Sequence, residues 1–179
     1  VKAGETLRRL PMAQASVLYD VLNGVALDSL LAPAKTFEGH LLLQHLPHTA
    51  EGDLLLLDRN YAAYRHVAAL TQAQRHLVIR CSHHSFAAAR RLFQGGPDSL
   101  TVTLSAPQKQ RAALLKQGLP LEVKVRFVRV ILSSGEVEVL VTSLLEESTY
   151  TPLDFKILYN LRWGVETFYD RLKNHLTLE

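Results

Sequence analysis

Five residues in two distant segments have the types and spacing that metal-dependent phosphate chemistry requires. Asp58 directly follows a run of four leucines, and Tyr159, Arg162, Glu166 and Lys173 recur far downstream at intervals of three, four and seven positions. At about 100° per residue on a helix, these four side chains share one face. Carboxylates are preferred ligands of Mg²⁺ and Mn²⁺, and Arg and Lys neutralise phosphate oxygens. The set therefore suits two acids around a divalent cation beside a phosphate.

The downstream four residues lie in a segment with strong helix signals. Thr151 can cap a helix and Pro152 suits its first position. We predict one helix from there to Leu176, about 25 residues and about 37 Å long. Six apolar residues lie opposite the polar face, and we expect them to pack on a sheet: Ile157, Leu161, Val165, Phe168, Leu172 and Leu176.

Asp58 lies in a strand–helix–strand pattern. The run Leu54–Leu57 is typical of a strand buried on both faces of a sheet. A helix from Ala62 to about Leu70 and a second strand at His76–Arg80 follow, so we expect the two strands to be parallel. Asp58 would then lie at the end of a sheet strand, where ligands and catalytic groups are common in α/β folds.

Further elements flank this unit. Asn23-Gly24, between residues 17–22 and 25–31, predicts an antiparallel hairpin. Thr36 can cap a helix that runs to about residue 46. Residues 85–150 contain predicted strands at 99–104, 121–132 and 136–142 and a helix at 108–117. The whole pattern predicts an α/β domain.

Less specific interpretations of the same residues stay open. Asp58 can cap the helix that follows it, and the polar helix face can be an ordinary solvated face on which Arg162 and Glu166 form a surface ion pair. Cys81 with His83 and His84 lacks a recognised zinc spacing, so a polar loop is favoured there.

Composition limits the class of protein. The 179 residues are 47% hydrophobic and 21% charged, which is typical of a globular domain, and a single cysteine excludes a disulfide framework. The net charge of +3 permits a polyanionic partner without proving one. No apolar run reaches the roughly 18 residues of a membrane helix. We expect a cytoplasmic protein that does not bind membranes.

The two chemistry-bearing segments resemble one protein family. The spacing Tyr159-x-x-Arg162-x-x-x-Glu166-x₆-Lys173, within YNLRWGVETFYDRLK, is similar to the Y-R-E-K signature of bacterial DDE transposases of the insertion-sequence-four group. All four residues and all three spacings match. Upstream, GDLLLLDRNY resembles the family's second-aspartate segment, with Asn60 where Gly is common. The resemblance extends from about residue 13 to the end.

This resemblance implies both a fold and a site. The fold would be RNase H-like, a mixed sheet flanked by helices, with residues 1–179 as a single catalytic domain fragment and residues 85–150 as a β-rich insertion between the second and third acids. Asp58 would be the second catalytic, metal-binding acid and Glu166 the third. The DNA phosphates near the cut would be contacted by Tyr159, Arg162, Lys173 and Arg59.

The resemblance also implies a reaction and partners. The family hydrolyses phosphodiester bonds and transfers strands at transposon ends, with two Mg²⁺ or Mn²⁺ ions held by Asp, Asp and Glu. The partner would be double-stranded DNA, on which a homodimer assembles, in the nucleoid of a bacterial cytoplasm.

One acid of this set is not accounted for. The family's first Asp lies on a strand before the hairpin, and the residues around Asp20 resemble the family's segment immediately after that acid. We therefore expect the first Asp and its strand upstream of Val1, and a chain that is inactive and binds metal poorly alone. Two alternatives remain: a DNA-binding remnant of a transposase without chemistry, and an unrelated α/β metal-dependent nuclease.

Overall fold

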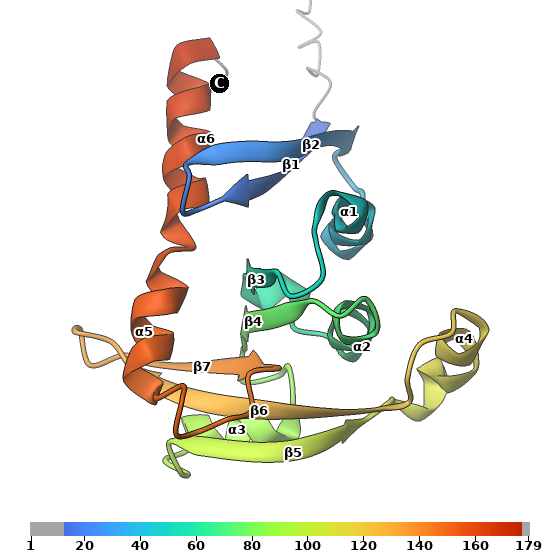
Figure 1. Cartoon of the computed structure of the whole chain (residues 1–179), viewed down its shortest axis with the longest axis vertical. Coiled ribbons are helices and arrows are strands. Elements are labelled where there is room, and N and C mark those ends of the chain that lie inside the picture. Colours follow the sequence, from blue (N-terminus) through green and yellow to red (C-terminus); the bar gives the residue numbers. More distant parts are fainter. Residues whose placement is uncertain (1–12, 177–179) are drawn as a thin grey trace, which may run out of the picture.

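The computed structural model describes residues 13–176, which form two β-sheets with helices around them (Figure 1). The strands are β1 (Ala13–Asp20), β2 (Val25–Pro33), β3 (Leu54–Leu57), β4 (His76–Arg80), β5 (Ser99–Ser105), β6 (Glu122–Ile131) and β7 (Val137–Thr142). The α-helices are α1 (Glu38–His45), α2 (Tyr64–Gln72), α3 (Ala87–Phe93), α4 (Arg111–Lys116), α5 (Pro152–Asn160) and α6 (Trp163–Leu176). Short 3-10 helices follow α1 (η1, Leu46–His48), follow β3 (η2, Arg59–Tyr61) and precede α4 (η3, Gln108–Gln110). The expected mixed α/β fold is confirmed. No helix within residues 13–176 has both the length and the apolar character needed to cross a bilayer.

The larger sheet has five strands in the order β3-β4-β7-β6-β5. β3 and β4 are parallel, as predicted, with Leu54 opposite His76, and the other pairs are antiparallel. Strands from residues 85–150 thus continue the sheet that carries β3 and β4. The boundaries of the insertion expected in this region stay a prediction.

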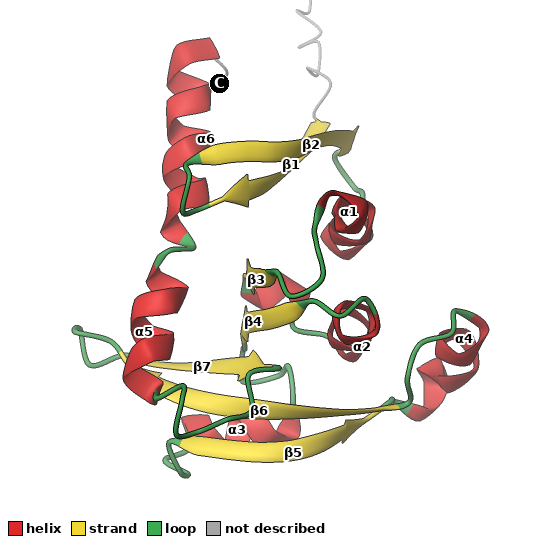
Figure 2. Ribbon diagram, viewed as in Figure 1, coloured by secondary structure: helices red, strands yellow, loops and turns green. Residues whose placement is uncertain are grey.

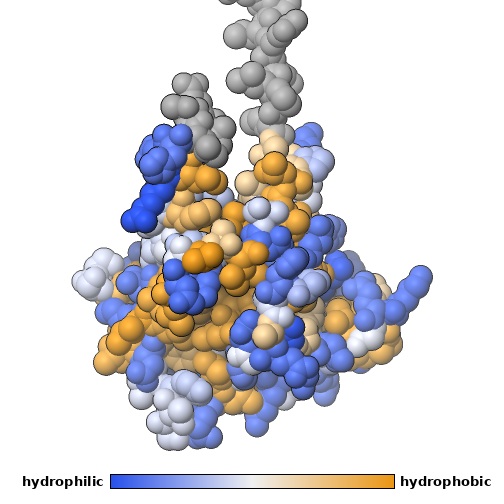
Figure 3. All heavy atoms as spheres, turned by 45° about the horizontal axis from the view of Figure 1, so that its top comes forward, coloured by the Kyte–Doolittle hydropathy of each residue, from blue (hydrophilic) through white to orange (hydrophobic). Residues whose placement is uncertain are grey.

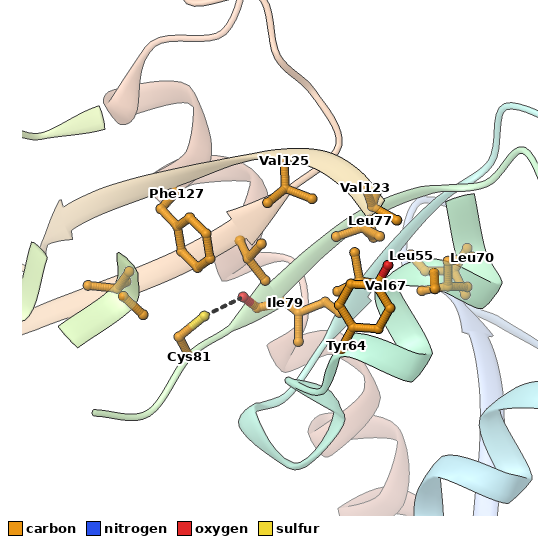
Figure 4. Close-up of a cluster of buried hydrophobic side chains, with 14 of the residues drawn as sticks. Leu55, Tyr64, Val67, Leu70, Leu77, Ile79, Cys81, Val123, Val125 and Phe127 are labelled. Atoms are coloured by element: carbon orange, nitrogen blue, oxygen red, sulfur yellow. Dashed lines mark hydrogen bonds between the residues drawn. The ribbon is translucent and has the colours of Figure 1, made fainter. Parts of the chain in front are cut away.

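Helices cover both faces of this sheet. Side chains alternate along each strand, so Leu77 and Ile79 of β4 face one layer and Val78 the other. The first layer contains α2, α3 and α4, and its core is drawn in Figure 4, where Tyr64 and Val67 of α2 lie beside Leu77 and Ile79 of β4. On the other face, α5 packs on β6 and β7. The sheet is therefore the middle layer of three.

The strands β1 and β2 form a separate antiparallel sheet, as predicted for the hairpin, and Figure 2 draws this pair apart from β3. Gly24 has the positive φ that the turn requires, 70°, while Asn23 does not. Instead, the Asp20 carboxylate accepts the backbone N–H groups of Leu22 and Asn23, at 2.9 and 3.0 Å. The turn is thus a four-residue turn closed by an Asp side chain.

The position of β3 differs from the prediction of a strand in the middle of a sheet. β3 lies at the sheet edge, and of its four leucines only Leu55 is buried. On its open side, cavities of about 300 and 150 Å³ are lined by β3 together with β1. Hydrophobic side chains gather in the middle of the face drawn in Figure 3. β3 therefore has the sequence of a strand from the middle of a sheet but lies at the sheet edge, and no strand within residues 13–176 pairs with its open side.

The predicted single C-terminal helix is interrupted. The predicted Thr151 cap at its start is confirmed, and the structure adds that Thr151 and Asp154 form a capping box. However, Leu161 and Arg162 form a turn in which backbone N–H groups donate to carbonyls three residues back, Leu161 to Leu158 and Arg162 to Tyr159. This tighter bonding separates α5 from α6.

The prediction that the apolar stripe packs on the sheet is wrong for the first half of this helix. Ile157 is 62% exposed and Leu161 38% exposed. The side chains that face the sheet are instead Phe155, Tyr159 and Arg162, each less than 9% exposed. The reason is that the polar face carries an aromatic ring and a long methylene chain, which cover the sheet as well as aliphatic side chains do. Val165, Phe168 and Leu172 are partly buried, Phe168 against Tyr19 of β1 at 5.1 Å between ring centroids. The Leu176 side chain lies outside those described.

Two smaller differences concern helices. Thr36 does not cap α1, because Phe37 holds the capping position and makes no side-chain hydrogen bond there. The helix α3 was not predicted, although its sequence AAARRLF contains strong helix formers. Ala89 and Leu92 of α3 are fully buried, so packing on the sheet stabilises it.

Gly39 gives a direct test of how α1 packs on α2. A methyl group at Gly39 would lie 2.1 Å from His66 Nε2, and this ring is held by a 2.8 Å hydrogen bond between its Nδ1 and the Tyr61 carbonyl. We predict that Gly39→Ala lowers the free energy of unfolding by about 1–3 kcal/mol, because overpacking a held ring is costly. Urea denaturation measures this change.

The matched control is Gly164→Ala in α6, where the added methyl would meet Tyr19 at 3.5 Å, an ordinary contact. Replacing a helical Gly by Ala normally stabilises by about 0.5–1 kcal/mol, so this variant should be neutral or more stable. Equal effects of the two substitutions would contradict the packing of α1 described here.

Candidate active site

Asp58 lies directly after β3, at the edge of the larger sheet. It is the N-cap of η2, and its Oδ1 accepts the backbone N–H of Arg59 at 2.6 Å. The capping role considered from sequence is therefore present. Oδ1 also accepts a hydrogen bond from Arg80 Nη2 at 2.9 Å. The carboxylate is held by two donors and remains about one-third exposed.

Arg80 is a site residue that the sequence analysis missed. It is the last residue of β4, and its second terminal nitrogen donates to Glu138 Oε1 of β7 at 3.0 Å. The signal that could have found it is its position at the end of the strand parallel to β3, since parallel strands bring their ends to the same sheet edge.

Tyr159 connects α5 to the strand that ends at Asp58. Its hydroxyl donates to the Leu57 carbonyl at 3.1 Å, and the side chain is 5% exposed. Burial raises the pKa of Tyr159 well above its usual value, so the phenol keeps its proton and remains a donor. This contact fixes the distance between the helix and the residue before Asp58.

Arg162 lies in the turn between α5 and α6 and is 8% exposed. Its Nη2 donates to Glu166 Oε1 at 2.7 Å, so the predicted ion pair exists. The guanidinium carbon lies 5.6 Å from the centre of the Tyr159 ring and 5.1 Å from that of Trp163. Its buried Nε has no partner within the described residues. Arg162 is thus a mostly buried cation and not part of a solvated face.

One cavity joins the two predicted segments. It has a volume of about 270 Å³ and is lined by Asp58 from the strand side and Arg162 from the helix side. Glu166 is not one of its lining residues, but it accepts a hydrogen bond from Arg162, which is. The structure thus connects the environments of the two acids, and both side chains stay accessible, Asp58 at 32% exposed and Glu166 at 43%.

The residues that line the same cavity include Glu38, Tyr61 and Tyr169, which sequence reasoning did not select. Burial raises the pKa of Tyr61 to about 12, and the negative charge of Glu38 contributes to this increase. The phenol is therefore neutral at physiological pH. Glu38 accepts a hydrogen bond from the Asn60 side chain at 3.2 Å. Because these residues come from α1, η2 and α6, no local sequence pattern links them.

The remaining predicted DNA contacts lie further out. The Arg59 side chain is exposed at the start of η2 and lines a separate cavity of about 180 Å³ together with Arg80. Lys173 is exposed in the last turns of α6. Both are accessible to a large anionic partner, and their binding role stays a prediction.

The donors in the described part of the chain suit a metal site only in part. Between residues 13 and 176, no three His, Cys, Asp or Glu side chains are grouped as a metal ion would require. Asp58 and Glu166 supply oxygen donors of the type that Mg²⁺ and Mn²⁺ prefer. Asp20 is engaged by its own turn, where the Asn23 side chain lowers the pKa of its carboxyl group. A third acid would have to come from elsewhere.

The Tyr159 hydrogen bond can be tested by removing one oxygen. Tyr159→Phe removes the hydroxyl that donates to the partly buried Leu57 carbonyl, so we predict a loss of about 1 kcal/mol in the free energy of unfolding. The control is Tyr150→Phe, because Tyr150 packs on Phe155 in the same layer and its hydroxyl makes no hydrogen bond within residues 13–176. Chemical denaturation compares the two, and equal stability of both variants would contradict the contact.

Comparison with known proteins identifies the family. A search of curated proteins gave no match. A family model described as the transposase DDE domain matches residues 2–179, nearly the whole chain. The five-stranded mixed sheet flanked by helices is consistent with the RNase H-like fold of these transposases. This match covers nearly the whole chain and excludes the unrelated nuclease considered from sequence, so the chain belongs to the transposase DDE domain family.

Proposed function

We propose that this chain is part of the catalytic core of a DNA transposase of the insertion-sequence-four group, with Asp58 as its second and Glu166 as its third metal-binding acid. The reaction is hydrolysis of phosphodiester bonds at transposon ends, followed by strand transfer. The observation that carries this proposal is the cavity lined by both Asp58 and Arg162, with Arg162 bound to Glu166. It brings together segments that are distant in the sequence.

The hydrogen bonds of the two acids support a metal-binding role. In each carboxylate one oxygen is held by an arginine, Asp58 Oδ1 by Arg80 and Glu166 Oε1 by Arg162. The other oxygen of each accepts no hydrogen bond from residues 13–176 and is available to a cation. When bound, two Mg²⁺ or Mn²⁺ ions supply the charge that activates the attacking hydroxyl and stabilises the leaving oxygen.

Cationic side chains around the acids suit a DNA phosphate. Arg162 has a buried Nε–H without a partner among the described residues, so a phosphate oxygen would satisfy an otherwise costly group. Arg59 and Lys173 are exposed and can follow the DNA backbone further out. Tyr159 is the fourth proposed contact. To bind a phosphate, its hydroxyl would break its hydrogen bond to the Leu57 carbonyl and donate to a phosphate oxygen instead.

The open edge of β3 supports a further part of the proposal, a strand that carries the first acid and precedes Val1. Within residues 13–176, β3 and β1 each have one edge without a partner strand, and both line the cavities of about 300 and 150 Å³. Backbone N–H and C=O groups on open edges attract another strand. A strand inserted there would pair with both edges, cover Leu54 and Leu56, and end near Asp58.

This proposal extends to partners and place of action. The substrate is double-stranded DNA at transposon ends, and two copies of the protein assemble on it, one per end. The site of action is the nucleoid in a bacterial cytoplasm, where the mobile DNA lies.

The two acids can be tested in the transposase that includes the proposed upstream strand. We predict that Asp58→Asn and Glu166→Gln each lower Mg²⁺-dependent cleavage of transposon-end DNA by more than about 100-fold, because even outer partners of metal ligands typically contribute 10- to 100-fold. Gel analysis of cleaved ends measures this. Asp53→Asn and Asp170→Asn are exposed acids with the same charge change and should retain activity.

Three outcomes would contradict this assignment. Retained cleavage in either acid variant would remove that acid from the site. A wild-type protein that binds the DNA without cutting it would be a non-catalytic remnant. Cleavage by the 179-residue chain itself, abolished by Asp20→Ala, would mean that the first acid lies on the hairpin.

The proposed strand can be tested independently of catalysis by amide hydrogen exchange. We predict that a chain extended upstream protects the outward-facing amides of β3 and β1 by about tenfold or more relative to the 179-residue chain, because edge amides gain partners. Amides of β7, which is paired on both sides, serve as the internal control. Identical exchange at β3 in the two chains would exclude the inserted strand.

A further inference from the structure

Arg80 bridges two acids that come from the strands on either side of it. β4 lies between β3 and β7, and the Arg80 side chain reaches Asp58 beyond β3 with one terminal nitrogen and Glu138 on β7 with the other. We propose that Arg80 is a positioning residue for the Asp58 carboxylate and that Glu138 holds Arg80 in the orientation that this requires. The inference rests on the proposed metal-binding role of Asp58.

The two oxygens of the Asp58 carboxylate differ in their hydrogen bonds. Oδ1 accepts both the Arg59 N–H, at 2.6 Å, and Arg80 Nη2, at 2.9 Å. Oδ2 accepts no hydrogen bond from the described residues. Two donors on one oxygen restrict the rotation of the carboxylate and leave Oδ2 as the oxygen available to a cation.

Glu138 explains why Arg80 stays in place. Its side chain is only 14% exposed and its Oε1 lies 3.0 Å from Arg80 Nη1. Without Glu138, the long Arg80 side chain would exchange among several rotamers, and the loss of that freedom opposes a fixed contact with Asp58. The partly buried Glu138 carboxylate, which binds the other terminal nitrogen of Arg80, restricts the Arg80 side chain to fewer rotamers.

The orientation of the guanidinium group favours this role over a simple link between strands. Arg80 Nε is buried and has no hydrogen-bond partner within residues 13–176. An unsatisfied buried N–H costs about 1–3 kcal/mol. The guanidinium group of Arg80 therefore adopts an orientation in which Nη1 and Nη2 each donate to a carboxylate, while its Nε–H has no partner within residues 13–176. A planar two-pronged arginine can do this, whereas a lysine cannot.

The test follows the Asp58 carboxyl carbon by ¹³C NMR in the aspartate-labelled 179-residue chain, with Asp58→Asn to assign the signal. Glu138→Gln should move this signal toward that of a solvated aspartate and broaden it. The control is Glu136→Gln, since Glu136 lines the same cavity as Arg80, is exposed, and makes no side-chain contact within residues 13–176. This control should leave the signal in place.

An unchanged Asp58 signal in Glu138→Gln, with the amide spectrum of a folded protein, would overturn the proposal. If Glu138→Gln does not fold, Glu138→Asp gives the same readout, because it keeps the charge but is too short to reach Arg80 without moving it. Equal shifts in Glu138→Gln and Glu136→Gln would mean a general charge effect, which also overturns the proposal.

A Mn²⁺ titration separates this inference from the proposed function. In the longer transposase that includes the proposed upstream strand, bound Mn²⁺ should broaden the Asp58 signal, and Glu138→Gln should require about tenfold more Mn²⁺ for half-broadening than wild type, as expected for an outer partner of a metal ligand. If Mn²⁺ broadens the wild-type Asp58 signal no more than those of exposed aspartates, the metal-binding role of Asp58 fails. The metal-free comparison of the two glutamine variants then still decides whether Arg80 positions Asp58.

Discussion

A hydrogen bond between residues 102 positions apart, from the Tyr159 hydroxyl to the Leu57 carbonyl, joins the two halves of the candidate site. It holds α5 against the strand that ends at Asp58, and the turn after α5 then brings Arg162 to the cavity that Asp58 lines. Because Arg162 is bound to Glu166, the position of Glu166 depends on the same contact. The high pKa that burial gives Tyr159 keeps this link intact over the physiological pH range.

The sheet supplies the other half of this arrangement. Asp58 and Arg80 come from the ends of the parallel pair β3 and β4, and Glu138 from the neighbouring antiparallel strand. Asp58 and Glu166 are each paired with an arginine, so these two carboxylates are held while one oxygen of each remains available. Such pairing reduces the repulsion between acids before a cation binds.

Much of this could be predicted from the sequence, where local patterns decide the outcome. The hairpin, the parallel strand pair and the helix cap at Thr151 depend on neighbouring residues, and all are found. The orientation of the C-terminal helices could not be predicted, because hydrophobicity alone treats Tyr159 and Arg162 as polar although their ring and methylene groups cover the sheet. Arg80 and Glu138 were missed because their importance arises only from the strand order β3-β4-β7.

The central claim is that Asp58 and Glu166 bind a common pair of cations. Its most direct test is the anomalous X-ray signal of Mn²⁺ in crystals of the transposase that contains this chain together with its proposed upstream strand. The account predicts Mn²⁺ peaks at about 2.0–2.2 Å from one oxygen of each acid and about 4 Å from one another. Ordered carboxylates more than about 10 Å apart, beyond the reach of two ions at that spacing, would contradict it.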